Sequence, residues 1–142
     1  MLVAASALYA LGLWWMTLRP TPYDDGTAGV LRAFLALLAS SPVTAWVTFD
    51  VVEFSANVVM FVPLGVLALL WGGTWWVGIL SGLAVSAAIE TTQALFLPTR
   101  VADVRDLVAN TLGAAVGVAV AALLARAVRL HSERIADAIE SS

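Results

Sequence analysis

Long apolar runs constrain this chain more than any other feature of its sequence. A membrane-spanning helix needs about 20 mostly apolar residues, with a range of about 17–25. Four runs meet this requirement, and we expect each of them to span a membrane: residues 2–18, 54–71, 75–97 and 107–125. The first run is longer than the usual core of a signal peptide, so we expect it to be a retained membrane helix.

The composition supports a membrane protein. Of the 142 residues, 61% are hydrophobic and 12% are charged. In a soluble domain about 45–50% of the residues are apolar and about 25% are charged. The net charge of −3 argues against nucleic acid as a partner. The chain contains no cysteine, which excludes disulfides, thiol catalysis and thiolate metal sites. We therefore expect residues 1–142 to form a single all-α domain that is integral to a membrane.

Two segments outside the four runs also have helical character. "VLRAFLALLAS", residues 30–40, is too short to span a membrane. We expect it to be an amphipathic helix at the membrane interface or a re-entrant segment. The polar tail, residues 126–142, reads as an amphipathic helix on the membrane surface. The expected fold is a membrane four-helix bundle with these two additions.

Small residues recur one turn apart in the third and fourth runs, at Gly78 and Gly82 and at Gly113 and Gly117. Such faces let helix backbones approach closely. We expect them to pack helices of this chain together, although a chain rich in glycine and alanine can contain the spacing by chance. A homodimer through the same faces is a further open alternative.

Polar residues interrupt three of the runs at similar depths. Short connections make the second, third and fourth runs antiparallel neighbours. Asn57, Gln93 and Asn110 then lie about 6 Å inside the membrane, and Glu90 about 10 Å, at one end of the bundle. Such residues normally face a protein interior or a wet cavity. We predict one polar pocket, with these ligand-binding residues: Asn57, Glu90, Gln93, Arg100, Asp103, Asp106 and Asn110.

Structural roles compete with ligand binding at several of these positions. Asp103 has the spacing of a helix N-cap, and Asp106 lies where the helix dipole favours an acid. The three amide side chains can serve as hydrogen bonds between helices. Arg100 is expected to pair with Asp103 or Asp106 across the mouth of the pocket. Pro63 should kink the second run and free a backbone carbonyl group near residue 59.

At these residues the sequence resembles the VanZ-like family of small bacterial membrane proteins. The matching elements are "NVVMFVPLG" at residues 57–65, Glu90-x-x-Gln93, and the pattern of Arg, Asp and Asn between Arg100 and Gly113. The resemblance implies a four-helix protein of the bacterial cytoplasmic membrane, with the motif-bearing loops outside and both termini in the cytoplasm. It also implies a link to the cell envelope, because the family's namesake lowers susceptibility to teicoplanin.

The arginine residues do not settle the orientation, because four lie on one side of the predicted membrane and three on the other. The cytoplasmic placement of both termini therefore depends on the resemblance.

Two classes of function follow, and we favour the first. The chain would bind the polar head of a membrane lipid or of a lipid-linked envelope precursor, with Arg100 and Arg105 pairing with phosphate. Alternatively, it would be a membrane enzyme acting on a lipid-linked phosphate or glycan. In that case Glu90, Asp103 and Asp106 would be catalytic or would bind a divalent cation. A proton-coupled transporter built around Glu90 is a third, weaker alternative.

Overall fold

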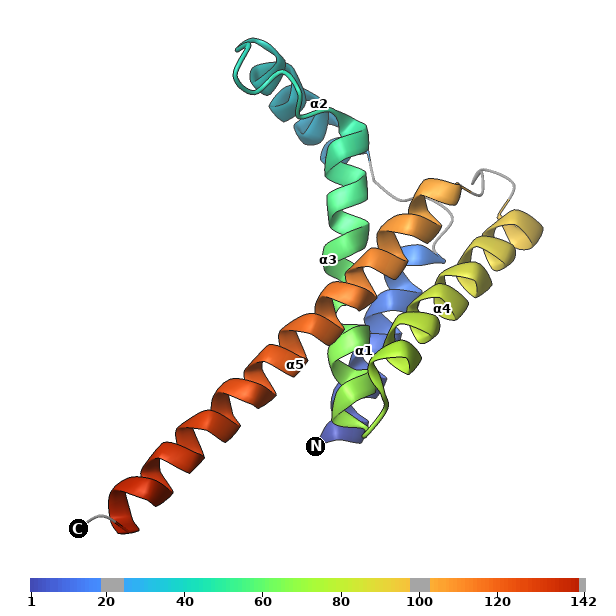
Figure 1. Ribbon diagram of the computed structural model, residues 1–142. Coiled ribbons are helices and arrows are strands. Elements are labelled where there is room, and N and C mark those ends of the chain that lie inside the picture. The colour runs from blue at the N-terminus through green and yellow to red at the C-terminus, as the bar shows by residue number, and fades with distance from the viewer. Residues whose placement is uncertain (19–24, 98–102, 141–142) are drawn as a thin grey trace.

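The computed structural model describes residues 1–18, 25–97 and 103–140, and the regular secondary structure of these residues is all α-helical (Figure 1). The order of helices is α1 (Leu2–Thr17), α2 (Asp25–Ala39), α3 (Phe49–Leu70), α4 (Trp75–Phe96) and α5 (Val104–Glu140). The predicted all-α fold class is therefore confirmed.

Three of the helices are long and apolar enough to cross a membrane: α3, α4 and the part of α5 from Val104 to Ile139. The chain is thus a multi-pass membrane protein. The first predicted span, residues 2–18, forms α1. With 16 residues, α1 is apolar but shorter than the three helices that are long enough to cross a membrane. A helix of this length rises about 24 Å, compared with a hydrocarbon core of about 30 Å.

α3 and α4 form the antiparallel hairpin that their short connection predicts. Thr48 caps the start of α3, where its hydroxyl oxygen accepts a hydrogen bond of 3.4 Å from the backbone N–H of Val51. Between the two helices Gly72 has a φ of +82°, a left-handed conformation that favours glycine. This tight turn brings the end of α3 and the start of α4 to the same end of the bundle.

Glycine contacts hold the three long helices together. Gly113 and Gly117 of α5 lie against the backbone of α3. A Cβ atom added at Gly117 would overlap the carbonyl oxygen of Val62, and one added at Gly113 would overlap that of Val58. Gly78 and Gly82 of α4 lie against side chains of α5. The predicted close packing through these residues is confirmed, and it occurs within one chain. Association of two chains stays a prediction.

Two side-chain hydrogen bonds attach α1 to α3. The Tyr9 hydroxyl donates to the carbonyl oxygen of Met60 at 3.1 Å, and the Trp71 indole N–H donates to the Ser6 hydroxyl at 3.1 Å. Pro63 lies inside α3 and removes one backbone donor from the turn that contains Met60. Pro63 has no N–H to donate to the carbonyl oxygen four residues earlier in α3. The Tyr9 hydroxyl donates to the next carbonyl oxygen along the chain, that of Met60.

The fourth predicted span and the helix predicted in the polar tail are continuous in the structure. The predicted span 107–125 and the described part of the tail form one continuous helix, α5. No glycine or proline occurs after residue 117, so the change in composition near residue 126 does not interrupt the helix. Residues 122–139 are exposed, and this part of α5 extends beyond the other helices (Figure 1).

The predicted helix in the first loop is present as α2 and begins earlier than expected, at Asp25. It lies beyond the N-terminal end of α3, away from the bundle formed by the other helices (Figure 1). Val30, Phe34 and Leu37 are exposed on α2. Their spacing places these apolar side chains on one face of the helix.

Candidate functional site

A cavity of about 560 Å³ lies at the end of the bundle where α1 and α4 end and α3 and α5 begin. We call it the polar cavity. Five of the seven predicted ligand-binding residues line it, which places side chains from three helices around one space. The full lining consists of Met16, Thr17, Phe49, Glu53, Ala56, Asn57, Val59, Met60, Ile89, Glu90, Gln93, Asp106 and Asn110.

Glu53 is a cavity residue that the predicted ligand-binding set omits. It lies one helical turn before Asn57 on α3, so both side chains share a face. Asp106 and Asn110 have the same spacing on α5. This repeated spacing is the signal in the sequence that points to Glu53.

Each of the three cavity amides donates a hydrogen bond to another helix. These bonds join α3 to α5, α4 to α1 and α5 to α4, so the amides do connect helices, as the structural alternative predicted. Each of these bonds uses one of the two N–H donors of its amide nitrogen. The bonds are Asn57 Nδ2 to Asp106 Oδ1 at 2.6 Å, Gln93 Nε2 to the Thr17 carbonyl oxygen at 2.7 Å, and Asn110 Nδ2 to Ser86 Oγ at 2.8 Å.

Asn110 has an unpaired acceptor within the cavity wall. Its side chain is 3% exposed, and its Oδ1 atom is buried with no hydrogen-bond partner among the described residues. A buried polar atom left without a partner costs about 1–3 kcal/mol.

Asp103 links the start of α5 to Glu90. Its side-chain Oδ1 accepts a hydrogen bond of 2.8 Å from the backbone N–H of Arg105, which is the geometry of an N-cap. Its own backbone N–H donates to Oε2 of Glu90 at 3.0 Å. The predicted capping role of Asp103 is confirmed. The residue lies beside the polar cavity rather than in its lining.

The basic residues are not part of the described cavity lining. Arg105 extends to the start of α3, where Nη1 lies 3.5 Å from the Asp50 carboxylate and Nη2 donates to the Asp50 carbonyl oxygen at 3.3 Å. Both side chains are more than half exposed, so this pair contributes about 0–1 kcal/mol. Arg100 lies outside the described residues, and its pairing with Asp103 or Asp106 stays a prediction.

The described residues contain no group of three His, Asp or Glu side chains placed to hold a metal ion. Glu90, Asp103 and Asp106, the predicted ligands of a divalent cation, do not form such a group. Glu90 and Asp106 line the cavity, while Asp103 contacts Glu90 through its backbone.

Comparison with known proteins agrees with the motifs that line the cavity. No curated protein and no solved structure matches the chain. The sequence model of one family, described as VanZ/LLP1, matches residues 6–125, which include all the described cavity residues. The match covers most of the chain and ends where the exposed part of α5 begins. The chain belongs to the VanZ/LLP1 family.

Proposed function

We propose that this protein binds the polar head of an envelope lipid, or of a lipid-linked envelope precursor, in the polar cavity. The observation that carries the proposal is the convergence of acids and amides from three helices on one space of about 560 Å³. Polar groups at membrane depth are costly unless they face such a space. The resemblance to the family's namesake connects this binding to the cell envelope and to teicoplanin susceptibility.

The cavity favours a head that donates hydrogen bonds. Glu53, Glu90 and Asp106 bring carboxyl groups to the lining, and no described lining residue is basic. An ionised carboxylate only accepts hydrogen bonds. Each amide uses one of its two N–H donors in a contact between helices, which lowers the number of donors that it can offer to a ligand. The fitting ligand is therefore an ammonium or hydroxyl group, and a phosphate on the same lipid would lie outside the described lining.

Headgroup selection tests this proposal directly. The protein would be placed in nanodiscs of equal phosphatidylethanolamine, phosphatidylcholine and phosphatidylglycerol, and the lipid retained on the released protein would be measured by native mass spectrometry. Phosphatidylcholine lacks the N–H donors of phosphatidylethanolamine, and phosphatidylglycerol is anionic. We expect phosphatidylethanolamine to be enriched about tenfold over phosphatidylcholine, the effect of one hydrogen bond to a charged group at the lower end of its range. Equal retention of phosphatidylethanolamine and phosphatidylcholine would contradict the proposal.

The proposal includes a placement in the bacterial cytoplasmic membrane. α1 would cross the membrane beside α3 despite its shorter length, since bilayers thin locally around short helices. α2 would lie at the interface, because Val30, Phe34 and Leu37 would otherwise expose an apolar face to water. Both termini would be cytoplasmic, and the polar cavity would then open on the extracytoplasmic side.

Cysteine labelling tests this orientation. The chain has no cysteine, so Thr27→Cys on α2 and Ser132→Cys near the end of α5 each create a single thiol at an exposed position. We expect an impermeant maleimide to label the Thr27→Cys protein in intact cells and the Ser132→Cys protein only after lysis. The reverse pattern would place the polar cavity on the cytoplasmic side.

A further inference from the structure

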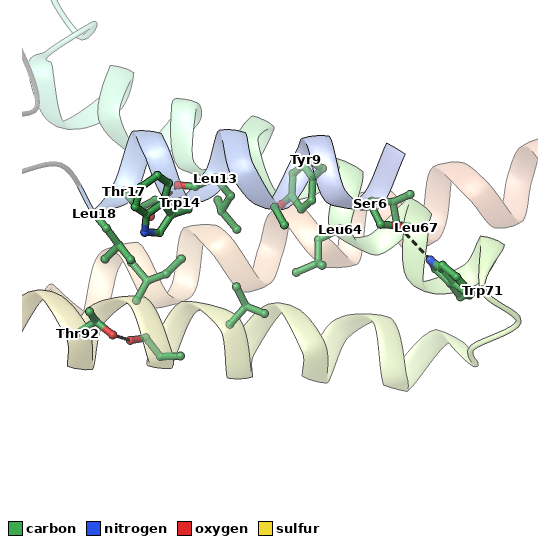
Figure 2. Close-up of a pocket in the computed structure, with 14 residues that line it drawn as sticks. Ser6, Tyr9, Leu13, Trp14, Thr17, Leu18, Leu64, Leu67, Trp71 and Thr92 are labelled. Carbon is green, nitrogen blue, oxygen red and sulfur yellow. Dashed lines mark hydrogen bonds between the residues drawn. The ribbon is translucent and has the colours of Figure 1, made fainter. Parts of the chain in front are cut away.

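An apolar groove of about 450 Å³ runs between α1, α3 and α4 (Figure 2). Its walls are formed mainly by aliphatic and aromatic side chains, with α1 along one side and Leu64, Leu67 and Trp71 of α3 on another. Val85, Ala88 and Ile89 contribute the surface of α4. We call this space the apolar groove.

The apolar groove and the polar cavity meet at two residues. Thr17 at the end of α1 and Ile89 of α4 line both spaces. The hydrogen bond from Gln93 to the Thr17 carbonyl oxygen ties α1 to α4 at this junction. The two spaces therefore adjoin. The apolar groove follows α1 as far as Thr17, and the polar cavity begins there.

Polar side chains in the groove are already paired within the protein. Thr17 and Thr92 donate to carbonyl oxygens one turn earlier, at 2.8 Å and 2.7 Å. Tyr9 donates to α3, and the Ser6 hydroxyl accepts from Trp71, the bond drawn in Figure 2. These pairings leave a hydrocarbon surface as the main feature of the groove, in contrast to the unpaired acceptor of the polar cavity.

We propose that the apolar groove holds one hydrocarbon chain of the same lipid whose head occupies the polar cavity. This inference rests on the proposed function and adds to it the class of ligand, an amphiphile with a donor-bearing head and at least one long chain. From Ser6 to Thr17 the groove follows α1 for about 16 Å. That length is close to half of a hydrocarbon core of about 30 Å, which is the depth available to one acyl chain in its leaflet.

A chain held in this groove would strengthen head binding by keeping the head close to the polar cavity, and not by hydrophobic transfer. Lipid tails are as apolar as the groove, so moving a chain from the bilayer into it gains little hydrophobic free energy. The adjoining cavity instead restricts where the head lies, because the head and chain are joined in one molecule. Any bilayer lipid can fill an apolar groove; occupancy that depends on both spaces is what distinguishes this proposal.

Two neighbouring alanines provide a matched test. Ala88 lines the apolar groove, whereas Ala87 lines neither space. Both are exposed on α4, and both carbonyl oxygens accept a 2.7 Å bond from a threonine hydroxyl one turn later. The substitutions Ala88→Phe and Ala87→Phe therefore make the same chemical change on adjacent faces, and only the first fills the groove.

The experiment measures binding of palmitoyl lysophosphatidylethanolamine and palmitoyl lysophosphatidylcholine to protein in phosphatidylcholine nanodiscs. We expect Ala88→Phe to weaken binding of the ethanolamine lysolipid about tenfold relative to Ala87→Phe, because an added ring in an occupied space must displace its occupant. The preference for the ethanolamine over the choline head should persist in Ala87→Phe.

The outcomes separate the two proposals. Equal binding by both variants, with the head preference intact, would overturn the chain site and leave the head site standing. No preference for the ethanolamine head in wild type or Ala87→Phe would overturn the proposed function. In that case, weaker binding to Ala88→Phe would not show that one lipid occupies both spaces. If Ala88→Phe does not fold, Ala10→Phe in the groove and Ala7→Phe outside it decide the question in the same way.

Discussion

Gly117→Ala is expected to destabilise this protein by about 3 kcal/mol or more, at the upper end of the usual cost of overpacking. The added Cβ would overlap the carbonyl oxygen of Val62 and approach the backbone nitrogen of Val66 to 3.1 Å. Both atoms belong to the α3 backbone, which cannot rotate away as a flexible side chain can. α3 and α5 would have to separate, which would also disturb the two helices that contribute Asn57 and Asp106 to the polar cavity.

Gly12→Ala is the matched control for this substitution. Gly12 lies inside α1, and nothing lies within 4 Å of a Cβ atom built there. The same replacement should therefore be neutral or stabilising by up to about 1 kcal/mol, since glycine is the poorer residue in a helix interior. Unfolding of the purified proteins in mixed micelles of increasing dodecyl sulfate content would measure both. Equal stability of the two variants would contradict the close approach of α3 and α5.

Glu90→Gln is expected to leave the fold intact and to reduce headgroup selection about tenfold, which abolishes the expected preference for phosphatidylethanolamine; this is the lower end of the range for a hydrogen bond to a charged group. The glutamine side chain keeps the shape of glutamate, and its oxygen can still accept the 3.0 Å bond from the Asp103 backbone. The cavity nevertheless loses a carboxylate. Enrichment of phosphatidylethanolamine over phosphatidylcholine in nanodiscs would measure the change.

Glu133→Gln makes the same replacement on the exposed part of α5, outside the residues that match the family. It should change neither stability nor headgroup selection. A Glu90→Gln protein that folds and selects lipids as well as Glu133→Gln would remove Glu90 from the binding site. The polar residues of the cavity would then serve helix packing alone.

The convergence of polar residues could be predicted because it depends on geometry within helices. A helix rises 1.5 Å per residue, and residues three or four apart share a face. With short connections between α3, α4 and α5, the depths of Asn57, Glu90 and Asn110 followed by counting. The cap at Asp103 was predictable for the same reason, because a cap bonds to a backbone N–H a few residues away.

The sequence was a poorer guide to boundaries and partners. A change from apolar to polar composition near residue 126 suggested a separate surface helix in the tail. The two segments instead form one helix, because helix continuity depends on backbone dihedral angles and not on polarity. Arg105 was expected to serve the pocket, yet it pairs with Asp50 on α3. A long flexible side chain can reach several acids, and only the positions of two helix ends select among them.

Spacing along this chain thus determined the helices, the close glycine contacts and the depth at which polar residues gather. Tertiary packing decided which atoms of those residues remain available. The rotation of α5 against α4 pairs the Asn110 nitrogen with Ser86 and leaves its oxygen without a partner among the described residues. The position of α1 against α3 and α4 creates the apolar groove. Neither follows from sequence spacing, because the rotation and separation of helices depend on side chains that meet only after folding.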